Sequence, residues 1–197
     1  ECYDRPDLEL PAHQKNLLRA VQAANPNTVL TVVSSYPYAL GEAMELLPAI
    51  LYTTHAGPEL GNAVADTLLG KNNPAARCPI TWYRSAQDLP DIMEYDIISA
   101  ERTYLYDTVE PLFPFGHGLS YSSFVYRDFT AEEKPEGMLF RLTVENTSQR
   151  DGDEVVQLYY RALHPRVKRP LRQLCGFQRV PVPANTAVPV TIFVPWY

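Results

Sequence analysis

The clearest indication of how this chain folds is a short stretch, residues 113–124, with the sequence FPFGHGLSYSSF. Its twelve residues include three Phe, one Tyr, one Leu, one Pro and two Gly. This composition is too apolar for an ordinary exposed loop and too rich in Gly and Pro for a helix. Because Gly116 and Gly118 flank His117, the backbone there can adopt a positive φ or pass close to another segment. We therefore expect a buried, irregular crossing between two domains.

Before this crossing, helical and strand patterns alternate. Apolar residues at helical spacing predict helices, and short β-branched or apolar runs predict strands that are covered on both faces. The β-α-β-α-β order predicts an open sheet with helices on its faces. The expected helices span residues 11–24, 42–47 and 60–70, and the expected strands span residues 28–34, 49–53 and 78–82. Residues 83–110 carry many charges and Tyr side chains, and we expect a long excursion over the surface.

After the crossing, apolar residues recur with period two. The alternating segments are separated by turns rich in Pro, Gly and Asn, which predicts a β-sandwich. The expected strands span residues 139–144, 155–160, 174–180 and 188–194. Only four or five strands fit before Tyr197, so we expect this sandwich to be incomplete.

Composition and charge narrow the classes of partner. The 197 residues are 46% hydrophobic and 20% charged, as in a globular protein, and the formal net charge is −6. No basic face is evident, so we expect no nucleic-acid partner. Residues 161–172 are basic, but Pro165 and Pro170 interrupt them, and we interpret this segment as a solvated loop. No apolar run approaches the ~20 residues that span a bilayer, so no membrane partner is expected.

The sequence gives no sign of a metal or an organic cofactor. The odd number of cysteines and their wide spacing fit neither a disulfide framework nor a zinc motif. The four histidines are equally scattered. These residues are Cys2, Cys78 and Cys175, with His13, His55, His117 and His164.

A series of motifs resembles the C-terminal part of glycoside hydrolase family 3, the β-glucosidase and β-xylosidase group. The motifs occur in the family's order and cover nearly the whole chain, and FPFGHGLSY is the most specific of them. They are Asp4-Arg5 with LELP at 8–11, ANPNTV at 24–29, GNAVAD at 61–66 with Leu69-Gly70, PITW at 79–82, RTYLY at 102–106, residues 113–121, GDEVVQLY at 152–159 and GFQRV at 176–180.

The resemblance implies a domain layout. Such enzymes look like a (β/α)8-type barrel, then an α/β sandwich, then often a fibronectin-III-like domain. Residues 1–128 would be the C-terminal half of the α/β sandwich, an open sheet with helices. Residues 129–197 would be the fibronectin-III-like β-sandwich. The barrel, with the Asp nucleophile it carries in this family, would be absent from this chain.

The resemblance also implies a catalytic residue. Retaining glycoside hydrolysis uses two carboxyl groups about 5–5.5 Å apart, one as nucleophile and one as general acid/base. In many family members the acid/base is a Glu just before a Gly-x-Asp-Arg motif. Glu1-Cys-Tyr-Asp-Arg5 looks like that motif, with Cys2 where Gly is common. Glu1 is therefore the candidate acid/base, Glu9 is the fallback, and a frayed terminal residue is the alternative interpretation of Glu1.

Other polar and aromatic residues have both structural and functional interpretations, and we favour the structural one for each. Asp4-Arg5 is expected to pair locally, His55 to stabilise a turn after a strand, and His117 to be a core histidine bonded to backbone. Trp82 is expected in the core, and the Tyr-rich run is expected in interdomain packing rather than in a sugar subsite. That run comprises Tyr95, Tyr104 and Tyr106. Asn146-Thr-Ser148 is an acceptor sequence for N-glycosylation.

The expected function is that of a part of a retaining, exo-acting β-glycosidase that needs no metal or organic cofactor. Its partners would be an oligosaccharide or aryl glycoside substrate and the missing N-terminal barrel, and this chain alone would be inactive. Residues 34–38 and 95–102 look closer to the xylosidase branch than to the glucosidase branch. The alternatives are a non-catalytic structural or carbohydrate-binding module, or a piece without an independent fold. The cellular compartment is not predicted.

Overall fold

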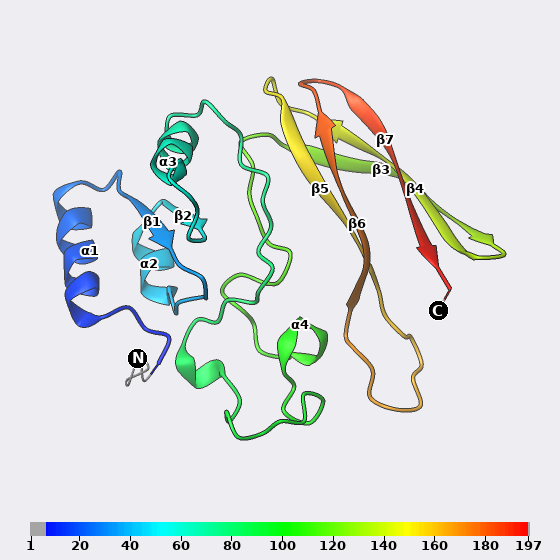
Figure 1. Cartoon of the computed structure of the whole chain (residues 1–197), viewed down its shortest axis with the longest axis horizontal. Helices are drawn as coiled ribbons and strands as arrows, with labels where there is room; N and C mark the ends of the chain where they lie inside the picture. Colours follow the sequence, from blue (N-terminus) through cyan, green and yellow to red (C-terminus); the bar gives the residue numbers. More distant parts are fainter. Residues whose placement is uncertain (1–6, 197) are drawn as a thin grey trace. The chain divides into compact units, whose positions relative to one another are not determined.

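The structure, a computed structural model, describes residues 7–196 of the chain (Figure 1). These residues form two compact units that are each discontinuous in sequence. The first unit comprises the described residues up to Gly61 together with Cys78–Phe115. The second comprises Asn62–Arg77 and the chain from Gly116 onward.

The first unit is built around a parallel pair of strands, β1 (Val29–Val33) and β2 (Ala49–Thr53). Helix α1 (Ala12–Ala24) precedes β1, and the short helix α2 (Gly41–Leu46) connects the two strands, as Figure 1 shows. Pro11 stands immediately before α1, and its carbonyl accepts bonds from the Gln14 and Lys15 amides. Proline suits this position because the first amides of a helix have no intrahelical acceptor. These four predicted elements are confirmed.

The prediction of a third strand at residues 78–82 is wrong. Within the described chain, this segment makes only an isolated antiparallel bridge, between Trp82 and Phe113. Pro79 interrupts the run, because it has no amide proton to donate to a neighbouring strand. The apolar side chains of the segment still reach the core, where Trp82 packs. That core is formed by Leu18, Val32, Leu40, Ala43, Leu47, Trp82 and Leu112.

Two further short helices lie in the long excursion of the first unit. They are η1 (Ala86–Asp88) and α4 (Thr103–Tyr106). Ser85 caps η1, since its hydroxyl accepts the Gln87 amide while the Asp88 carboxylate accepts the Ser85 amide. This reciprocal pairing satisfies donors that the helix itself cannot.

Helix α3 (Leu60–Leu68) leads into the second unit and ends close to the predicted position. Gly70, just beyond it, has a φ of 70°. The Gly70 amide donates to the Thr67 carbonyl and the Lys71 amide to the Asp66 carbonyl, so the last turn is closed by backbone bonds. A glycine in the left-handed region is the usual way to end a helix in this manner.

The second unit is a β-sandwich, as predicted. One sheet has the antiparallel order β3 (Phe124–Lys134), β4 (Gly137–Asn146) and β7 (Ala187–Pro195). The other pairs β5 (Gly152–Tyr160) with β6 (Gln173–Val182), and Figure 1 shows these two strands as one long ribbon pair. The shared core consists of Leu142, Val144, Val156, Val180, Val182, Val190 and Ile192.

The fold class therefore agrees with the expectation of an α/β part followed by a fibronectin-III-like β-sandwich. The expected boundary between residues 128 and 129 stays a prediction, and it falls inside β3. Strand β3 is exposed along most of its length and carries an irregularity between Arg127 and Thr130, with Asp128 at a φ of 54°. Without a buried face it has no alternating pattern, which is why this strand is missing from the strands predicted from the sequence.

The two glycines of the FPFGHGLSY motif are required by close approach. Gly116 has a φ of 82°, and a Cβ atom there would lie 2.2 Å from Gln157 Oε1. A Cβ atom on Gly118 would lie 2.2 Å from the carbonyl oxygen of Ala76. A larger residue would be strained by the positive φ at Gly116 and would displace the backbone of Ala76 at Gly118, so conformation and packing within the second unit explain the two glycines.

Candidate functional site

The predicted acid/base, Glu1, lies outside the described residues, as do Asp4 and Arg5. The described chain begins just after them, and it enters the first unit beside the loop that follows β1. There Glu9 forms a parallel bridge with Ala39, and the Ala39 amide donates to the Leu8 carbonyl at 2.8 Å.

The fallback candidate, Glu9, is engaged in an ion pair. Its Oε2 atom lies 2.6 Å from Lys15 Nζ, and the two side chains are partly buried. This ion pair ties the carboxylate to the helix that follows, α1, through Lys15. The geometry therefore favours a structural role for Glu9.

The carboxyl ends of β1 and β2 gather polar side chains. Ser34, directly after β1, is 2% exposed, and its hydroxyl donates to the Tyr36 carbonyl at 2.7 Å. The Tyr52 hydroxyl donates to the Ser34 carbonyl at 3.1 Å. These bonds hold the loop after β1 against β2, at the edge where open parallel sheets place their ligands.

At the same edge Ser35 and His55 meet. Ser35 Oγ lies 2.8 Å from His55 Nδ1, and both side chains are exposed. The contact joins the loop after β1 to the turn after β2. The sequence placed His55 after a strand, and the structure adds the serine partner, which no spacing rule would have indicated. No carboxylate among residues 7–196 orients the imidazole of this pair, so we assign it to turn geometry rather than to nucleophilic catalysis.

The aromatic residues of the first unit serve its core rather than an open sugar platform. Trp82 is 2% exposed and packs edge-to-face against Tyr52, with ring centroids 4.8 Å apart. Phe113 also packs edge-to-face against Trp82, with ring centroids 6.1 Å apart. A stacking platform for a sugar requires an exposed ring face, and Trp82 has none. The expectation of a core tryptophan is confirmed.

The Tyr-rich run divides into three different environments. Tyr104 stacks on Phe115 with centroids 4.1 Å apart, and Tyr106 is buried. Tyr95, in contrast, is 80% exposed. Two of the three rings thus pack within the first unit.

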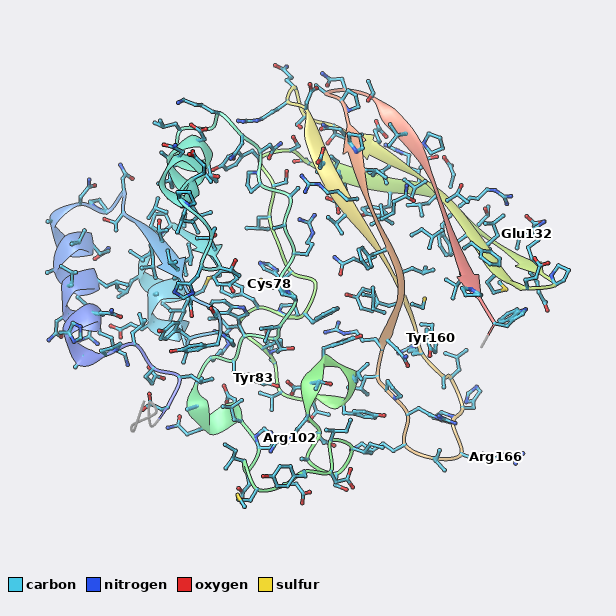
Figure 2. All side chains as sticks on the ribbon, viewed as in Figure 1. Cys78, Tyr83, Arg102, Glu132, Tyr160 and Arg166 are labelled. Carbon is cyan, nitrogen blue, oxygen red and sulfur yellow. The ribbon has the colours of Figure 1, made fainter. Side chains whose placement is uncertain are left out.

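A pocket of about 320 Å³ lies in the excursion of the first unit, and the sequence did not indicate it. Its lining combines acidic, hydroxyl and apolar side chains. The lining residues are Tyr83, Asp88, Leu89, Pro90, Ser99, Ala100, Glu101, Asp107, Thr108 and Val109. Figure 2 shows Tyr83 and Arg102, the residue that follows Glu101, on this part of the chain.

Tyr83 and Asp107 give the pocket its electrostatic character. Burial, and then the neighbouring Asp107 carboxylate, raise the pKa of Tyr83 well above its usual value, so its phenol stays protonated. Asp107 Oδ1 accepts the Val109 amide at 2.8 Å, whereas Oδ2 is buried and has no hydrogen-bond partner within residues 7–196. A water molecule or a ligand hydroxyl would satisfy that oxygen. No motif contains either residue in a recognisable role, and only the fold brings them together.

Arg102, the first residue of the RTYLY motif, directly follows Glu101, which lines this pocket. Its guanidinium donates to the carbonyl oxygens of Asp91 and Glu94. Glu101 and Thr103, on either side, have φ values of 51° and 65°. Residues other than glycine rarely adopt the left-handed region at positive φ, and the strain is largest for a β-branched residue such as Thr103. The arginine thus fixes a strained turn through backbone contacts.

His117 lies in the second unit and is partly buried. Burial, and then the positive charge of Arg77, lower its pKa from the ordinary value of 6.5. A neutral imidazole packed beside a cation is consistent with the expected structural histidine. Its surroundings therefore favour packing over proton transfer.

The acceptor residue of the glycosylation sequence, Asn146, is buried, whereas Thr147 is exposed. Asn146 is 1% exposed, and its side-chain amide donates to the carbonyls of Arg150 and Val182 at 2.8 and 2.9 Å. It therefore joins strand β4 to β6 through backbone oxygens. Asn146 is the last residue of β4, directly before the bend at residues 148–150, and its amide is needed to satisfy buried carbonyls.

Neither a metal centre nor a membrane span emerges from the described residues. Within residues 7–196, no group of three or more His, Cys, Asp or Glu side chains is arranged to hold a metal ion. Among the helices described, none is long and apolar enough to cross a bilayer.

The chain thus combines an α/β unit, with polar groups at the ends of its parallel strands, and a fibronectin-like β-sandwich. Residues 1–121 match the glycosyl hydrolase family 3 C-terminal domain, and residues 154–197 match the fibronectin type III-like domain. The class is therefore the C-terminal region of a glycoside hydrolase. The chain belongs to glycoside hydrolase family 3.

Curated relatives match along almost the whole chain. It is 37% identical to the probable beta-glucosidase J of Aspergillus fumigatus, over 99% of this chain and 25% of that protein. It is also 37% identical to the xylan 1,4-beta-xylosidase of Xylanibacter ruminicola, over 92% of this chain and 21% of that protein. The chain therefore spans about a quarter of the length of the relatives it matches.

Solved structures agree with this placement. The beta-glucosidase of Kluyveromyces marxianus superposes with a TM-score of 0.88 at 33% identity, over 98% of this chain and 24% of that one. The beta-glucosidase 3B of Thermotoga neapolitana, in complex with glycerol, also gives 0.88, at 27% identity and over 98% and 30% of the two chains.

Proposed function

We propose that this chain is the C-terminal part of a retaining, exo-acting β-glycosidase that removes terminal β-linked sugars from oligosaccharides. The observation that carries the proposal is the continuous similarity to β-glucosidases and a β-xylosidase, at 37% identity over nearly all of the chain. The remainder of the enzyme, with a barrel and its Asp nucleophile, would be supplied by residues outside this chain.

Within that enzyme we assign the general acid/base to Glu1. The assignment is supported by the Glu-x-x-Asp-Arg pattern of residues 1–5 and by the ion pair that occupies the fallback residue Glu9. A retaining enzyme uses this carboxyl group twice, first to protonate the leaving oxygen and then to activate water. No step of this reaction requires a metal or an organic cofactor.

The first test uses the 197-residue chain alone. Retaining hydrolysis needs two carboxyl groups, and the proposal places only one in this chain. Purified chain should therefore leave 4-nitrophenyl β-glucoside and β-xyloside intact. The control is to purify the chain again and to express it in a host that lacks β-glycosidases. Hydrolysis that persists in both preparations would refute the proposal that one of the two catalytic carboxyl groups lies outside this chain. The non-catalytic module would be favoured by a different result. In that case calorimetry would show that the chain binds neutral oligosaccharides, and no longer protein that contains the chain would hydrolyse them.

The second test asks whether Glu1 is the acid/base. A chimera would carry this chain in place of the matching part of the Kluyveromyces marxianus β-glucosidase. Glu1→Gln should slow cleavage of an alkyl glucoside by about 10²–10⁴-fold, the usual contribution of general acid–base catalysis. Azide should accelerate turnover of an activated aryl glucoside in this variant, because it needs no general base. Glu9→Gln is the matched control and should show neither effect.

A further inference from the structure

The loop between β5 and β6 concentrates positive charge in an acidic chain. Residues 161–172 read RALHPRVKRPLR, with four Arg, one Lys and no carboxylate, whereas the whole chain has a net charge of −6. All of these residues except Pro170 are exposed. Figure 2 shows Arg166 on this loop.

The arginines of this loop differ from most of the other basic residues, because their guanidinium groups have no carboxylate or carbonyl partner within residues 7–196. Elsewhere in the described chain, basic side chains commonly pair with carboxylates. Those that do so are Lys15, Arg19, Lys71, Arg77, Arg127, Lys134, Arg141 and Arg179. Arg102 and Arg150 donate to backbone carbonyls instead. Within residues 7–196, no ion pair or hydrogen bond occupies the guanidinium groups of Arg161, Arg166, Arg169 and Arg172.

This separation of charge is unfavourable for the chain by itself. Like charges in a short loop repel one another, and carboxylates that could neutralise them are abundant elsewhere in the sequence. Pro165 and Pro170 also fix φ within the loop, so fewer conformations are lost when a ligand binds. An anionic ligand would remove the repulsion and occupy the free donors.

We propose that the β5–β6 loop binds a polysaccharide that carries uronic-acid carboxylates. The planar fork of a guanidinium matches a carboxylate with two parallel hydrogen bonds, which favours arginine over lysine at such sites. Leu163, Val167 and Leu171 lie between the basic residues and are 72%, 63% and 51% exposed, so aliphatic groups are available to cover the C–H faces of sugar rings. The choice of a polysaccharide among polyanions rests on the proposed function.

The test is a binding measurement with the full 197-residue chain and polygalacturonate as the probe. At about 20 mM salt the chain should be retarded in gels that contain polygalacturonate and not in gels that contain neutral xylan. At about 500 mM salt, where the screening length falls well below 10 Å, the retardation should vanish. Arg166→Gln with Arg169→Gln should weaken binding by at least about ten-fold, because two exposed charge-assisted contacts are lost.

The matched control changes the same charge elsewhere in the second unit. Lys71→Gln with Arg179→Gln also removes two positive charges, from exposed ion pairs with Asp66 and Asp153. This variant should bind polygalacturonate as the unaltered chain does. An equal loss in both variants would show that only net charge matters and would overturn the proposal.

Two other outcomes would also overturn it. The first is no retardation by polygalacturonate at low salt. The second is tighter binding to vesicles with one-fifth phosphatidylserine, or to duplex DNA, since each would assign the loop to another class of polyanion. The binding measurement does not depend on catalysis. If the chimera with the Kluyveromyces marxianus enzyme is inactive but the chain still binds polygalacturonate, the proposed function is refuted and the binding proposal is not.

Discussion

The guanidinium of Arg77 lies 2.7 Å from the carboxylate of Glu154, and their side chains are only 13% and 10% exposed. The Tyr126 hydroxyl donates to the other carboxylate oxygen at 2.8 Å. A segment that precedes the FPFGHGLSY motif is thereby joined to strands β3 and β5. An ion pair at this depth is stable only while both partners and their hydrogen bonds are present.

Glu154→Gln should destabilise the second unit by about 3–5 kcal/mol, because it leaves the Arg77 charge buried without compensation. Urea denaturation followed by circular dichroism measures the loss. Glu132→Gln is the control, since Glu132 sits in an exposed cluster with Lys134 and Arg141, and its unfolding midpoint should not change. Equal midpoints for the two variants would contradict a buried role for Glu154.

His117 should make stability depend on pH below neutrality. Burial, and then the charge of Arg77, lower the pKa of His117 in the folded state. Below the unfolded pKa of about 6.5, the unfolded state therefore binds more protons at this residue than the folded state does. Stability should therefore be complete above pH 6.5 and should fall as the pH drops from there toward the folded pKa. The ring resonances of His117 in NMR should titrate with a midpoint below 6.5. A midpoint at or above that value would show that the imidazole is not desolvated.

Gly118→Ala should lower stability by at least about 1–3 kcal/mol, the usual cost of inserting a methyl group into packed structure. The new Cβ atom would meet the Ala76 carbonyl at 2.2 Å, and a backbone atom cannot move aside as a side chain can. Gly57→Ala is the matched control, because a Cβ atom there meets nothing within 4 Å. Thermal unfolding of the two variants compares them directly, and a tolerated Gly118→Ala would mean that the Ala76 segment is loosely held.

Asn146 should carry no glycan in folded protein that is secreted from a glycosylating host. Its amide donates to the carbonyls of Arg150, in the turn before β5, and of Val182, in β6, so a glycan on that nitrogen would have to displace both segments. Intact-mass spectrometry of the secreted chain measures occupancy. Ala187→Ser provides the positive control, because it places the same Asn-Thr-Ser triplet at the exposed turn residue Asn185. A glycan at Asn146 in soluble, folded chain would contradict the buried assignment.

The sequence predicted those features that depend on periodicity. The β-branched run before Ser34 and the alternating segment around Val144 identify strands, because each buries one face. The expectation that the first run is covered on both faces is wrong, since Val29 and Val33 are 42% and 41% exposed. Residues 78–82 do not join the sheet because Pro79 has no amide proton to donate. A pattern of apolar residues does not reveal this missing donor. Family motifs predicted the class of enzyme, which the matches along the chain confirm.

The pocket that contains Tyr83 and Asp107 was harder to predict from the sequence than the strands were. Tyr83 and Asp107 are far apart in sequence and belong to no periodic segment, so only the folded excursion shows that they share a pocket. The Asn146 triplet was identified as an acceptor sequence by its residue types alone, and these carry no information about burial. Burial of that amide follows from its hydrogen bonds across the sandwich, which no local pattern encodes.

The discontinuity of the second unit has a consequence for how such a module can be inherited. Asn73 donates to Ser122 and to the Asp151 carbonyl, and Arg77 pairs with Glu154, so residues from the 62–77 segment complete a sandwich whose strands begin at Phe124. A recombination event that moved only the strands would leave these acceptors without their donors. We therefore expect recombination to transfer the fibronectin-like unit together with the α/β segment that precedes it, and not the strands alone.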